Sequence, residues 1–248
     1  GTEIIEETVL EETEESLEGR FDHGERFYAP AGIEFPLYIA AKADTFGKRH
    51  LSPIDTPINV GETGDLYSFT AGNYQPTLFF NDGAVYYKFE SSDPDGIGFS
   101  MDLHPIIGEQ DILITAVFKN RGGIPVALSN DDGDSILFGG FGGGLAFSVA
   151  DLDPDTISYS KSDAVEKWVV AVMLIKEDSI FVKVDGQKFY EQNTDYIRLR
   201  GEEYQIYFGV SDGGDIDIDM YECAFSIGDF NEKTVEDIYD VLMVRYKL

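Results

Sequence analysis

The stretch that decides the fold is residues 204–248, YQIYFGVSDGGDIDIDMYECAFSIGDFNEKTVEDIYDVLMVRYKL. Gln205 to Val210 is apolar enough for a buried strand, and Asp212-Gly213-Gly214 is a turn sequence. Asp215 to Phe225 then alternates polar and apolar side chains, which is the pattern of a second, half-buried strand. From Glu232 onward the apolar residues recur at helical spacing and would form one face, namely Val235, Ile238, Tyr239, Leu242, Met243 and Tyr246. The end of the chain therefore predicts two strands and a closing amphipathic helix, with Asn231 as its N-cap.

The same pattern of short strands and tight turns extends back to residue 65. Turn residues such as Asn81-Asp82-Gly83, Asp131-Asp132-Gly133 and Asp185-Gly186 separate apolar or alternating segments. A hydrophobic content of 43% and an aromatic content of 13% over 248 residues supply a substantial core. We therefore predict an all-β sandwich, or jelly roll, for residues 65–248. The single cysteine, Cys223, excludes an internal disulfide and is expected to be a small buried hydrophobe.

Two segments precede this predicted sandwich. Residues 1–18 form an arm rich in glutamate without a basic residue, which we expect to be irregular alone and to dock on a partner or remain a solvated tail. Residues 19–64 contain four prolines and are interpreted as a connector that packs on the sandwich or on a neighbouring subunit. Within it, Glu34 to Ala43 fits either a short strand or a short helix.

The net charge of the chain limits the kinds of partner that it can bind. Forty-seven acidic against 18 basic residues give a formal net charge of −29, which repels phosphate backbones and so argues against nucleic-acid binding. No run of about 18 apolar residues is present, so membrane insertion is not expected. The acidic balance is compatible with a solvated surface, with Ca²⁺ or with basic partners.

Several segments, in order, resemble a known superfamily. They are Gln75-Pro76-Thr77-Leu78 with Gly83 to Glu90, Asp111 to Lys119, Trp168 to Ile175 with Ser179 to Gly186, Asp215 to Ser226 and the closing helix. Together they resemble the concanavalin A-like lectin/glucanase and laminin-G-like domains, as found in phage virion proteins. The resemblance implies a two-sheet jelly roll that often binds carbohydrate, sometimes with Ca²⁺, and it implies that Trp168 begins a core strand.

This resemblance leads to one expected function and two alternatives. We expect a non-enzymatic virion structural or surface protein, such as a fibre, decoration or receptor-binding component, with a lectin-like glycan-binding module. Its partners would be virion or cell-surface proteins reached through the N-terminal region, in a homo-oligomer or larger assembly on the virion or otherwise outside cells. The alternatives are a sandwich-type glycoside hydrolase acting on β-glucans and a purely structural decoration module.

The hydrolase alternative depends on Asp217-x-Asp219-x-x-Glu222. Sandwich β-glucanases carry a comparable E-x-D-x-x-E strand, and a retaining mechanism needs two carboxyl groups about 5–5.5 Å apart. Simple alternation places Asp217 and Asp219 on one face of the strand and Glu222 on the other, unless a bulge intervenes. We therefore interpret this segment as an ordinary alternating strand and assign no catalytic residue.

Two further sets of residues are candidates for binding. Tyr74, Phe141 and Tyr159 lie near predicted loops, where an exposed ring would stack on a sugar. Acidic loops offer oxygen ligands of the kind that Ca²⁺ prefers, at Asp131, Asp132, Asp134, Asp151, Asp153 and Asp155. No cofactor is required by this interpretation, and Ca²⁺ is the one ion it would accommodate.

Overall fold

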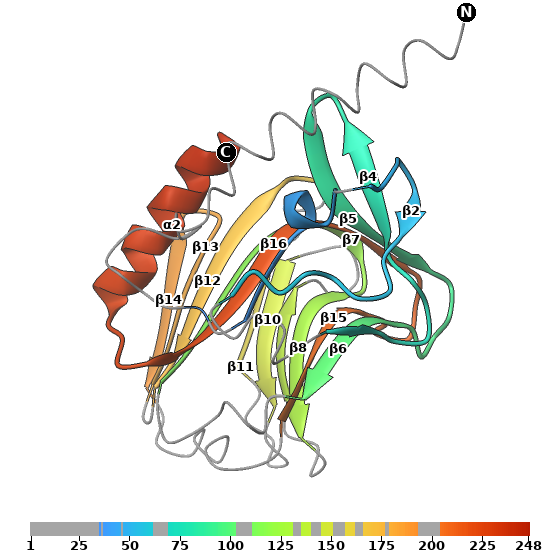
Figure 1. Cartoon of the computed structure of the whole chain (residues 1–248). Coiled ribbons are helices and arrows are strands. Elements are labelled where there is room, and N and C mark those ends of the chain that lie inside the picture. Colours follow the sequence, from blue (N-terminus) through green and yellow to red (C-terminus); the bar gives the residue numbers. More distant parts are fainter. Residues whose placement is uncertain are drawn as a thin grey trace, which may run out of the picture.

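The computed structural model describes residues 35, 37–45, 47–61, 69–102, 111–130, 135–139, 145–150, 157–161, 166–176, 179–192 and 204–248. Within this part of the chain, two antiparallel sheets face each other and one long helix lies outside them (Figure 1). The prediction of an all-β sandwich with a closing helix is confirmed. None of the described helices is both long and apolar enough to cross a membrane.

The first sheet contains nine strands, with the long β16 near its centre. Its hydrogen-bonded order is β14 (Gln187–Gln192), β13 (Ser179–Val184), β12 (Val169–Ile175), β7 (Asp111–Gly122), β16 (Ile216–Gly228), β5 (Ala84–Ser91), β4 (Thr77–Asn81) and β2 (Ser52–Pro53), with β1 (Leu37–Ala40) also paired to β16. This sheet therefore brings together strands from both ends of the described sequence.

The second sheet contains seven strands. Its order is β11 (Ile157–Lys161), β10 (Leu145–Ala150), β9 (Ser135–Gly139), β8 (Ile124–Asn130), β15 (Tyr204–Val210), β6 (Ile97–Asp102) and β3 (Thr70–Ala71). The predicted strands at 205–210 and 215–225 therefore end up in different sheets. Because β15 and β16 are consecutive, the Asp212-Gly213-Gly214 turn carries the chain from one layer to the other.

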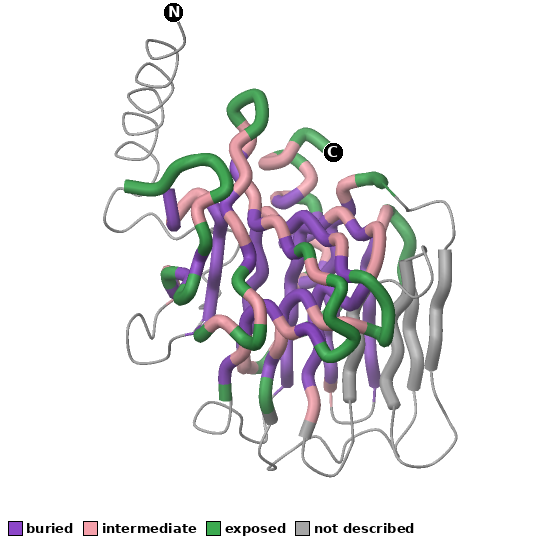
Figure 2. The backbone as a smooth tube through the Cα atoms, turned by 90° about the vertical axis from the view of Figure 1, so that its right-hand side faces the viewer, coloured by how far each residue is buried: buried purple, intermediate pink, exposed green. Residues whose placement is uncertain are grey.

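The main core consists of inward side chains from both sheets, and the buried residues are concentrated in the strands (Figure 2). Alternation turns Ile216, Ile218 and Met220 of β16 inward, where they are fully or almost fully buried. Tyr87, Phe89 and Phe99 meet edge to face at centroid distances of 5.4 to 6.3 Å. Such aromatic contacts add to the burial of apolar area, which drives the two sheets together. Cys223 belongs to the same core, as predicted.

Two hairpin turns follow directly from local sequence. Asp82 and Gly83 join β4 to β5 with positive φ angles of 47° and 76°, and Asp185 and Gly186 join β13 to β14 with 46° and 73°. These left-handed conformations match the twist of adjacent strands, and Asp-Gly pairs tolerate them. Both turns lie where the sequence predicts them.

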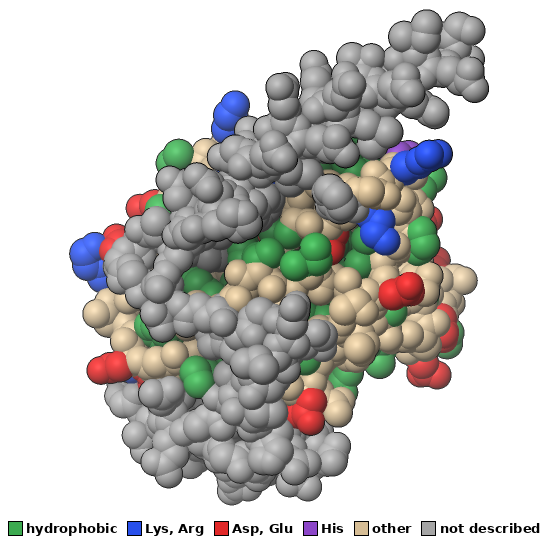
Figure 3. All heavy atoms as spheres, in the orientation of Figure 1, with side chains coloured by type: hydrophobic (Ala, Val, Ile, Leu, Met, Phe, Trp, Pro, Cys, Tyr) green, Lys and Arg blue, Asp and Glu red, His purple; other side chains and the backbone are tan. Residues whose placement is uncertain are grey.

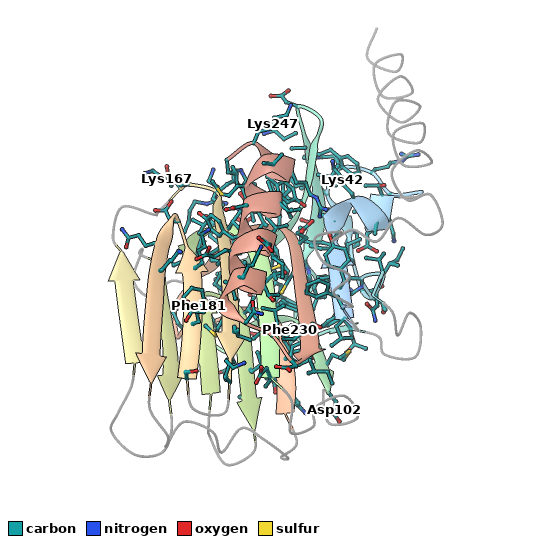
Figure 4. The ribbon with its side chains drawn as sticks, turned by 90° about the vertical axis from the view of Figure 1, so that its left-hand side faces the viewer. Lys42, Asp102, Lys167, Phe181, Phe230 and Lys247 are labelled. Atoms are coloured by element: carbon teal, nitrogen blue, oxygen red, sulfur yellow. The ribbon has the colours of Figure 1, made fainter. Side chains whose placement is uncertain are left out.

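The closing helix α2 (Glu232–Tyr246) covers part of the outer face of the first sheet (Figure 4). The Asn231 side chain caps it by accepting a hydrogen bond of 3.1 Å from the Thr234 amide. Val235, Ile238, Tyr239 and Leu242 are buried against outward-facing residues of the sheet, including Leu113, Val117, Val170, Val172, Leu174 and Phe181. We call this apolar layer, in which α2 packs on β7, β12 and β13, the covered half of the outer face.

The segment before the sandwich strands contributes to the first sheet. Of the two structures expected for Glu34 to Ala43, the chain adopts both in turn: strand β1 is followed by the 3₁₀ helix η1 (Ala41–Thr45). Asp44 of η1 is buried, and it accepts a hydrogen bond from the Tyr87 hydroxyl and another of 2.9 Å from the Ile58 amide. Burial raises the pKa of Asp44 in spite of these bonds. The contact joins the lead-in directly to the core.

Candidate functional site

Strand β16 changes neighbours along its length, and this change positions the candidate site. Its first half, Ile216 to Met220, pairs with β5, and its second half, Glu222 to Phe225, pairs with β1. Its register with β7 shifts between Met220 and Glu222. This β-bulge gives the strand one extra outward residue, so Tyr221 and Glu222 both lie on the outer side while Met220 and Cys223 point into the core.

The bulge overturns the expectation from simple alternation that Glu222 faces away from Asp217 and Asp219. All three carboxylates lie on the outer side of the sheet, but their surroundings differ. Glu222 is 0% exposed. It accepts a hydrogen bond of 2.8 Å from the Tyr38 hydroxyl and one from the Tyr246 hydroxyl, and Arg245 lies 3.4 Å from its Oε1. Glu222 therefore joins β1, β16 and α2 at a point that solvent does not reach.

Asp217 and Asp219 instead belong to a group of paired charges beside α2, on the part of the outer face that the helix does not cover. Arg121 Nη2 lies 2.7 Å from Asp217 Oδ1 and 2.9 Å from Asp219 Oδ2. Lys88 forms an ion pair with Asp217 and lies 3.3 Å from Asp219 Oδ1. We call Lys88, Arg121, Asp217 and Asp219 the charged cluster. Its members come from β5, β7 and β16, three strands that are neighbours in the sheet.

A line of aromatic rings adjoins the charged cluster. Trp168 stacks on Tyr221 at 3.8 Å between ring centroids, and Tyr221 stacks on Tyr246 at 4.6 Å. Tyr86 meets Trp168 edge to face at 5.5 Å and stacks on Phe79 at 5.1 Å. His50 ends the line, 4.2 Å from Phe79. We call these six residues the aromatic row, and together with the charged cluster they form the open half of the outer face.

The register of the strands explains why the two groups touch. Asp219 lies opposite Lys88, and two residues further along the same strands Tyr221 comes next to Tyr86, with their rings 6.2 Å apart. Side chains two residues apart on a strand share a face. Tyr86, Trp168, Tyr221, Phe79 and Tyr246 are all half-buried, so each ring is held by its neighbours and still reaches solvent.

The electrostatics of the open half fix its protonation states. Burial opposes ionisation of Asp217, but the hydrogen bonds from Arg121 and Lys88 outweigh it and lower the pKa to about 2. Burial, reinforced by the Asp219 charge, raises the pKa of Tyr86 to about 12 and also raises the pKa of Tyr221. At neutral pH Asp217 is therefore an acceptor, and both phenols are protonated and can donate.

Of the three predicted aromatic binding residues, the structure describes the side chain of Tyr74 alone. Tyr74 is not an exposed ring: it packs on the core, and its hydroxyl donates a 2.7 Å hydrogen bond to the Gly209 carbonyl. Phe141 lies outside the described residues, and Tyr159 lies in β11 opposite Phe147, with its side chain outside the described part. Trp168, expected in a core strand, instead precedes β12 and belongs to the aromatic row on the outer face.

The predicted Ca²⁺ ligands cannot be placed. Asp131, Asp132, Asp134, Asp151, Asp153 and Asp155 all lie outside the described residues. Among the residues that the structure does describe, no three His, Cys, Asp or Glu side chains come close enough to hold a metal ion. On the face drawn in Figure 3, the described Asp and Glu side chains are spread out rather than gathered.

Sequence reasoning missed the open half, although part of its signal is visible in the sequence. The outward positions of β5 carry Tyr86 and Lys88, and those of β16 carry Asp217, Asp219 and Tyr221, where a purely structural strand needs no particular residue. The sheet order decides that these two strands pair. It also decides that Arg121 and Trp168, from elsewhere in the chain, lie beside them.

The fold is similar to that of several solved binding domains and of one arabinofuranosidase. A structure of the botulinum neurotoxin serotype D ligand binding domain in complex with N-acetylneuraminic acid has a TM-score of 0.60 and 10% identity, covering 86% of this chain and 52% of that one. The binding domain of botulinum neurotoxin DC in complex with rat synaptotagmin II has a TM-score of 0.57 and 13% identity, covering 84% and 52%.

An arabinofuranosidase complexed with arabinofuranosyl-α-1,2-xylobiose also matches, with a TM-score of 0.52 and 13% identity over 76% of this chain and 50% of that one. The chain thus spans about half the length of these proteins. No protein-family model and no curated protein sequence matches it. The expectation of a sandwich of the lectin and glucanase type is confirmed at the level of the fold.

Proposed function

We propose that this chain is a non-enzymatic, lectin-like module that binds a glycan on the open half of the outer face of the first sheet. The observation that carries the proposal is the aromatic row, in which Trp168, Tyr221 and Tyr246 are stacked, half-exposed and adjacent to a group of fixed charges.

The chemistry of a sugar matches the two parts of this surface. A pyranose ring has C–H faces that pack on aromatic rings, and it has hydroxyl groups that need directed hydrogen bonds. The aromatic row supplies rings on which the C–H faces can pack, and the charged cluster supplies hydrogen-bond partners for the hydroxyl groups. Because the rings support one another and Arg121 holds both aspartates, the surface is ordered before a ligand arrives, which lowers the entropic cost of binding.

The geometry favours binding over hydrolysis. A general acid must reach the glycosidic oxygen, and Glu222 is enclosed by Tyr38, Tyr246 and Arg245. Asp217 is held ionised by two cations, so it cannot deliver a proton at neutral pH.

The arabinofuranosidase likeness keeps a sandwich-type glycoside hydrolase as the second candidate function. A reducing-sugar assay on β-glucans and arabinoxylan decides between them. Turnover that disappears in Glu222→Gln, with the fold intact by circular dichroism, would favour the hydrolase.

The single tryptophan makes the binding proposal directly testable. Trp168 is the one indole in the chain, so a sugar that stacks near it should change the intrinsic fluorescence. We expect hits from a glycan array to change this fluorescence saturably, and we expect Trp168→Ala to lose binding on the same array. Tyr207→Ala, which removes a half-exposed aromatic residue from the second sheet, is the matched control and should retain binding.

We also propose that the module works on a virion or other extracellular surface, in contact with neighbouring structural proteins. The sequence segments that resemble those of phage virion domains support this. The net charge of −29 also supports it, because it favours solubility on a surface exposed to water. Particle association without any glycan binding would instead favour a purely structural decoration module. Localisation of the tagged chain by immunogold labelling on particles tests the proposal.

A further inference from the structure

The charged cluster contains a buried acceptor to which no described residue donates a hydrogen bond. Asp219 is 5% exposed, and its Oδ2 is paired with Arg121 at 2.9 Å. Its Oδ1 lies 3.3 Å from Lys88 Nζ but has no hydrogen bond from any described residue. Buried carboxylate oxygens are nearly always hydrogen-bonded, and an exception is costly unless a further donor arrives.

Donors lie beside this acceptor. Arg121 uses Nη2 for both aspartates, and the other N–H groups of its guanidinium have no hydrogen bond to the described part of the chain. A guanidinium presents its donors in a rigid planar fork, so these N–H groups are directed at fixed angles. The protonated Tyr86 and Tyr221 hydroxyls are close enough for the Asp219 charge to raise both of their pKa values. An acceptor and several donors are therefore grouped on one patch.

The local charge of the patch is balanced, in contrast to the chain as a whole. Around the charged cluster, outward positions of β5, β7 and β16 carry the cations Lys88, Lys119 and Arg121 and the carboxylates of Glu90, Asp217 and Asp219. These three positive and three negative charges cancel, whereas the whole chain carries −29. The patch thus offers no net positive charge to an anionic sugar, and the surrounding molecule repels one.

We propose that Asp219 determines ligand specificity and that the ligand is an uncharged saccharide bound through two adjacent hydroxyl groups. One hydroxyl donates to Asp219 Oδ1 once the side chains that cover this oxygen, the flexible Lys88 among them, move aside. The next hydroxyl accepts from the Arg121 guanidinium, while a C–H face of the sugar lies on the aromatic row. The inference rests on the proposed function, because it names the ligand class for the same surface.

The experiment compares two ligand classes and three proteins by Trp168 fluorescence titration. The ligands are neutral gluco-, galacto- and manno-oligosaccharides and counterparts that carry a sialic or uronic acid. The proteins are the parent chain, Asp219→Asn and Asp215→Asn. The last is a matched control, because Asp215 is an exposed aspartate immediately before β16. We expect Asp219→Asn to weaken binding of the neutral ligand at least tenfold and Asp215→Asn to change it less than twofold.

The outcomes separate the two proposals. If neutral sugars perturb Trp168 in the parent but Asp219→Asn binds them equally well, the role of Asp219 is wrong and the glycan-binding proposal stands. Tighter binding of the acidic counterparts would overturn the assignment of an uncharged ligand. If no sugar of either class changes the fluorescence, the proposed function fails, and this inference fails with it.

A second variant guards against loss of the fold. Arg121→Lys keeps the positive charge beside both aspartates but removes the fork that would donate to the second hydroxyl. We expect it to fold with the thermal stability of the parent to within a few degrees and to bind the neutral ligand at least fivefold more weakly. An unchanged affinity in this variant would overturn the proposed contact whether or not Asp219→Asn folds.

Discussion

The two halves of the outer face of the first sheet are built from the same strands, yet they carry different chemistry. In β7, Leu113 and Val117 lie under α2, whereas Arg121, further along the same side of the strand, pairs with aspartates. In β16 the order is reversed, with Asp217 and Asp219 first and Ala224 later in the covered half. Antiparallel pairing aligns the apolar end of one strand with the apolar end of the other, and the polar ends likewise.

One face of the sheet is thus divided into a part that stabilises the fold and a part that is available for recognition. Under α2, apolar burial without a directional requirement holds the helix in place. Beyond it, half-exposed rings and paired charges contribute less to stability, but they present directional groups to solvent. Substitutions in the covered half should therefore lower stability and spare binding, and those in the open half should weaken binding at a smaller cost in stability.

Glu222, at the boundary of the two halves, should give the largest effect on stability. Replacing it with alanine removes the buried acceptor shared by Tyr38 and Tyr246 and leaves Arg245 without this carboxylate. Breaking a buried ion pair in this way costs about 4 kcal/mol. Urea unfolding followed by circular dichroism measures the loss, and Asp229→Ala, which removes an exposed carboxylate just after β16, is the control. A loss below about 1 kcal/mol in Glu222→Ala would contradict the boundary role.

Leu242→Ala should cost slightly less. Leu242 is fully buried between α2 and the sheet, and truncating a buried leucine costs about 3 kcal/mol through lost burial and the cavity left behind. Val244→Ala on the same helix, at a side chain that is 78% exposed, should leave the unfolding midpoint unchanged. The affinity for any glycan ligand should remain that of the parent in both variants, and a loss of affinity in Leu242→Ala alone would show that the two halves are coupled.

Trp168→Ala should have an intermediate effect on stability and a dominant effect on binding. Half-burial and one stacked neighbour, Tyr221, contribute about 2 kcal/mol together. Calorimetric titration, which does not depend on the indole signal, measures the loss of binding beside a thermal melt. Full affinity in a folded Trp168→Ala protein would remove the aromatic row from the site.

The helix cap is a smaller contribution on the covered side. Asn231→Ala removes the side-chain oxygen that accepts from the Thr234 amide and should cost about 1 kcal/mol. Asn231→Ser keeps a capping oxygen and should recover most of this loss in the same urea titration. Equal stability of the serine and alanine variants would mean that the cap is not what stabilises this helix end.

The smallest effect is the pH dependence contributed by Asp217. Its pKa is about 2 in the folded protein against 3.8 for an unperturbed aspartate, so its ion pairs stabilise the fold above about pH 4 and are lost as the pH falls towards 2. Because the side chain is 39% exposed, solvent screening limits the contribution to less than about 1 kcal/mol. The difference between parent and Asp217→Asn in urea unfolding should shrink from pH 5 to pH 2. A constant difference would show that the pairing does not stabilise the fold.

Much of the fold could be predicted because its signals are local. Asp82-Gly83 and Asp185-Gly186 have to form tight turns, since few other residue pairs adopt two successive left-handed conformations at low cost. The spacing of Val235, Ile238 and Leu242 defines a helix face over any sheet that receives it. The class of fold and the closing helix followed from such patterns.

The candidate site depended on information that no local pattern contains. Asp219, Lys88 and Arg121 are remote in sequence and become neighbours because β5, β16 and β7 are adjacent in the sheet. Glu222 lies on the outer side of the strand because of the bulge, which occurs where the partner of β16 changes from β5 to β1. Trp168, expected in the core, lies outside it and stacks on Tyr221 on the outer face, a contact that depends on which strands are neighbours.

The amino-acid order alone was therefore sufficient for the strands, the turns, the capped helix and the acidic character of the chain, since each depends on residues within a few positions of one another. The meeting of the aromatic row with the charged cluster, and the enclosure of Glu222 under α2, arose from long-range pairing. Side-chain alternation specifies that a residue faces outward, but the sheet order specifies which side chains it contacts there. A binding surface consists of such contacts between residues from different strands.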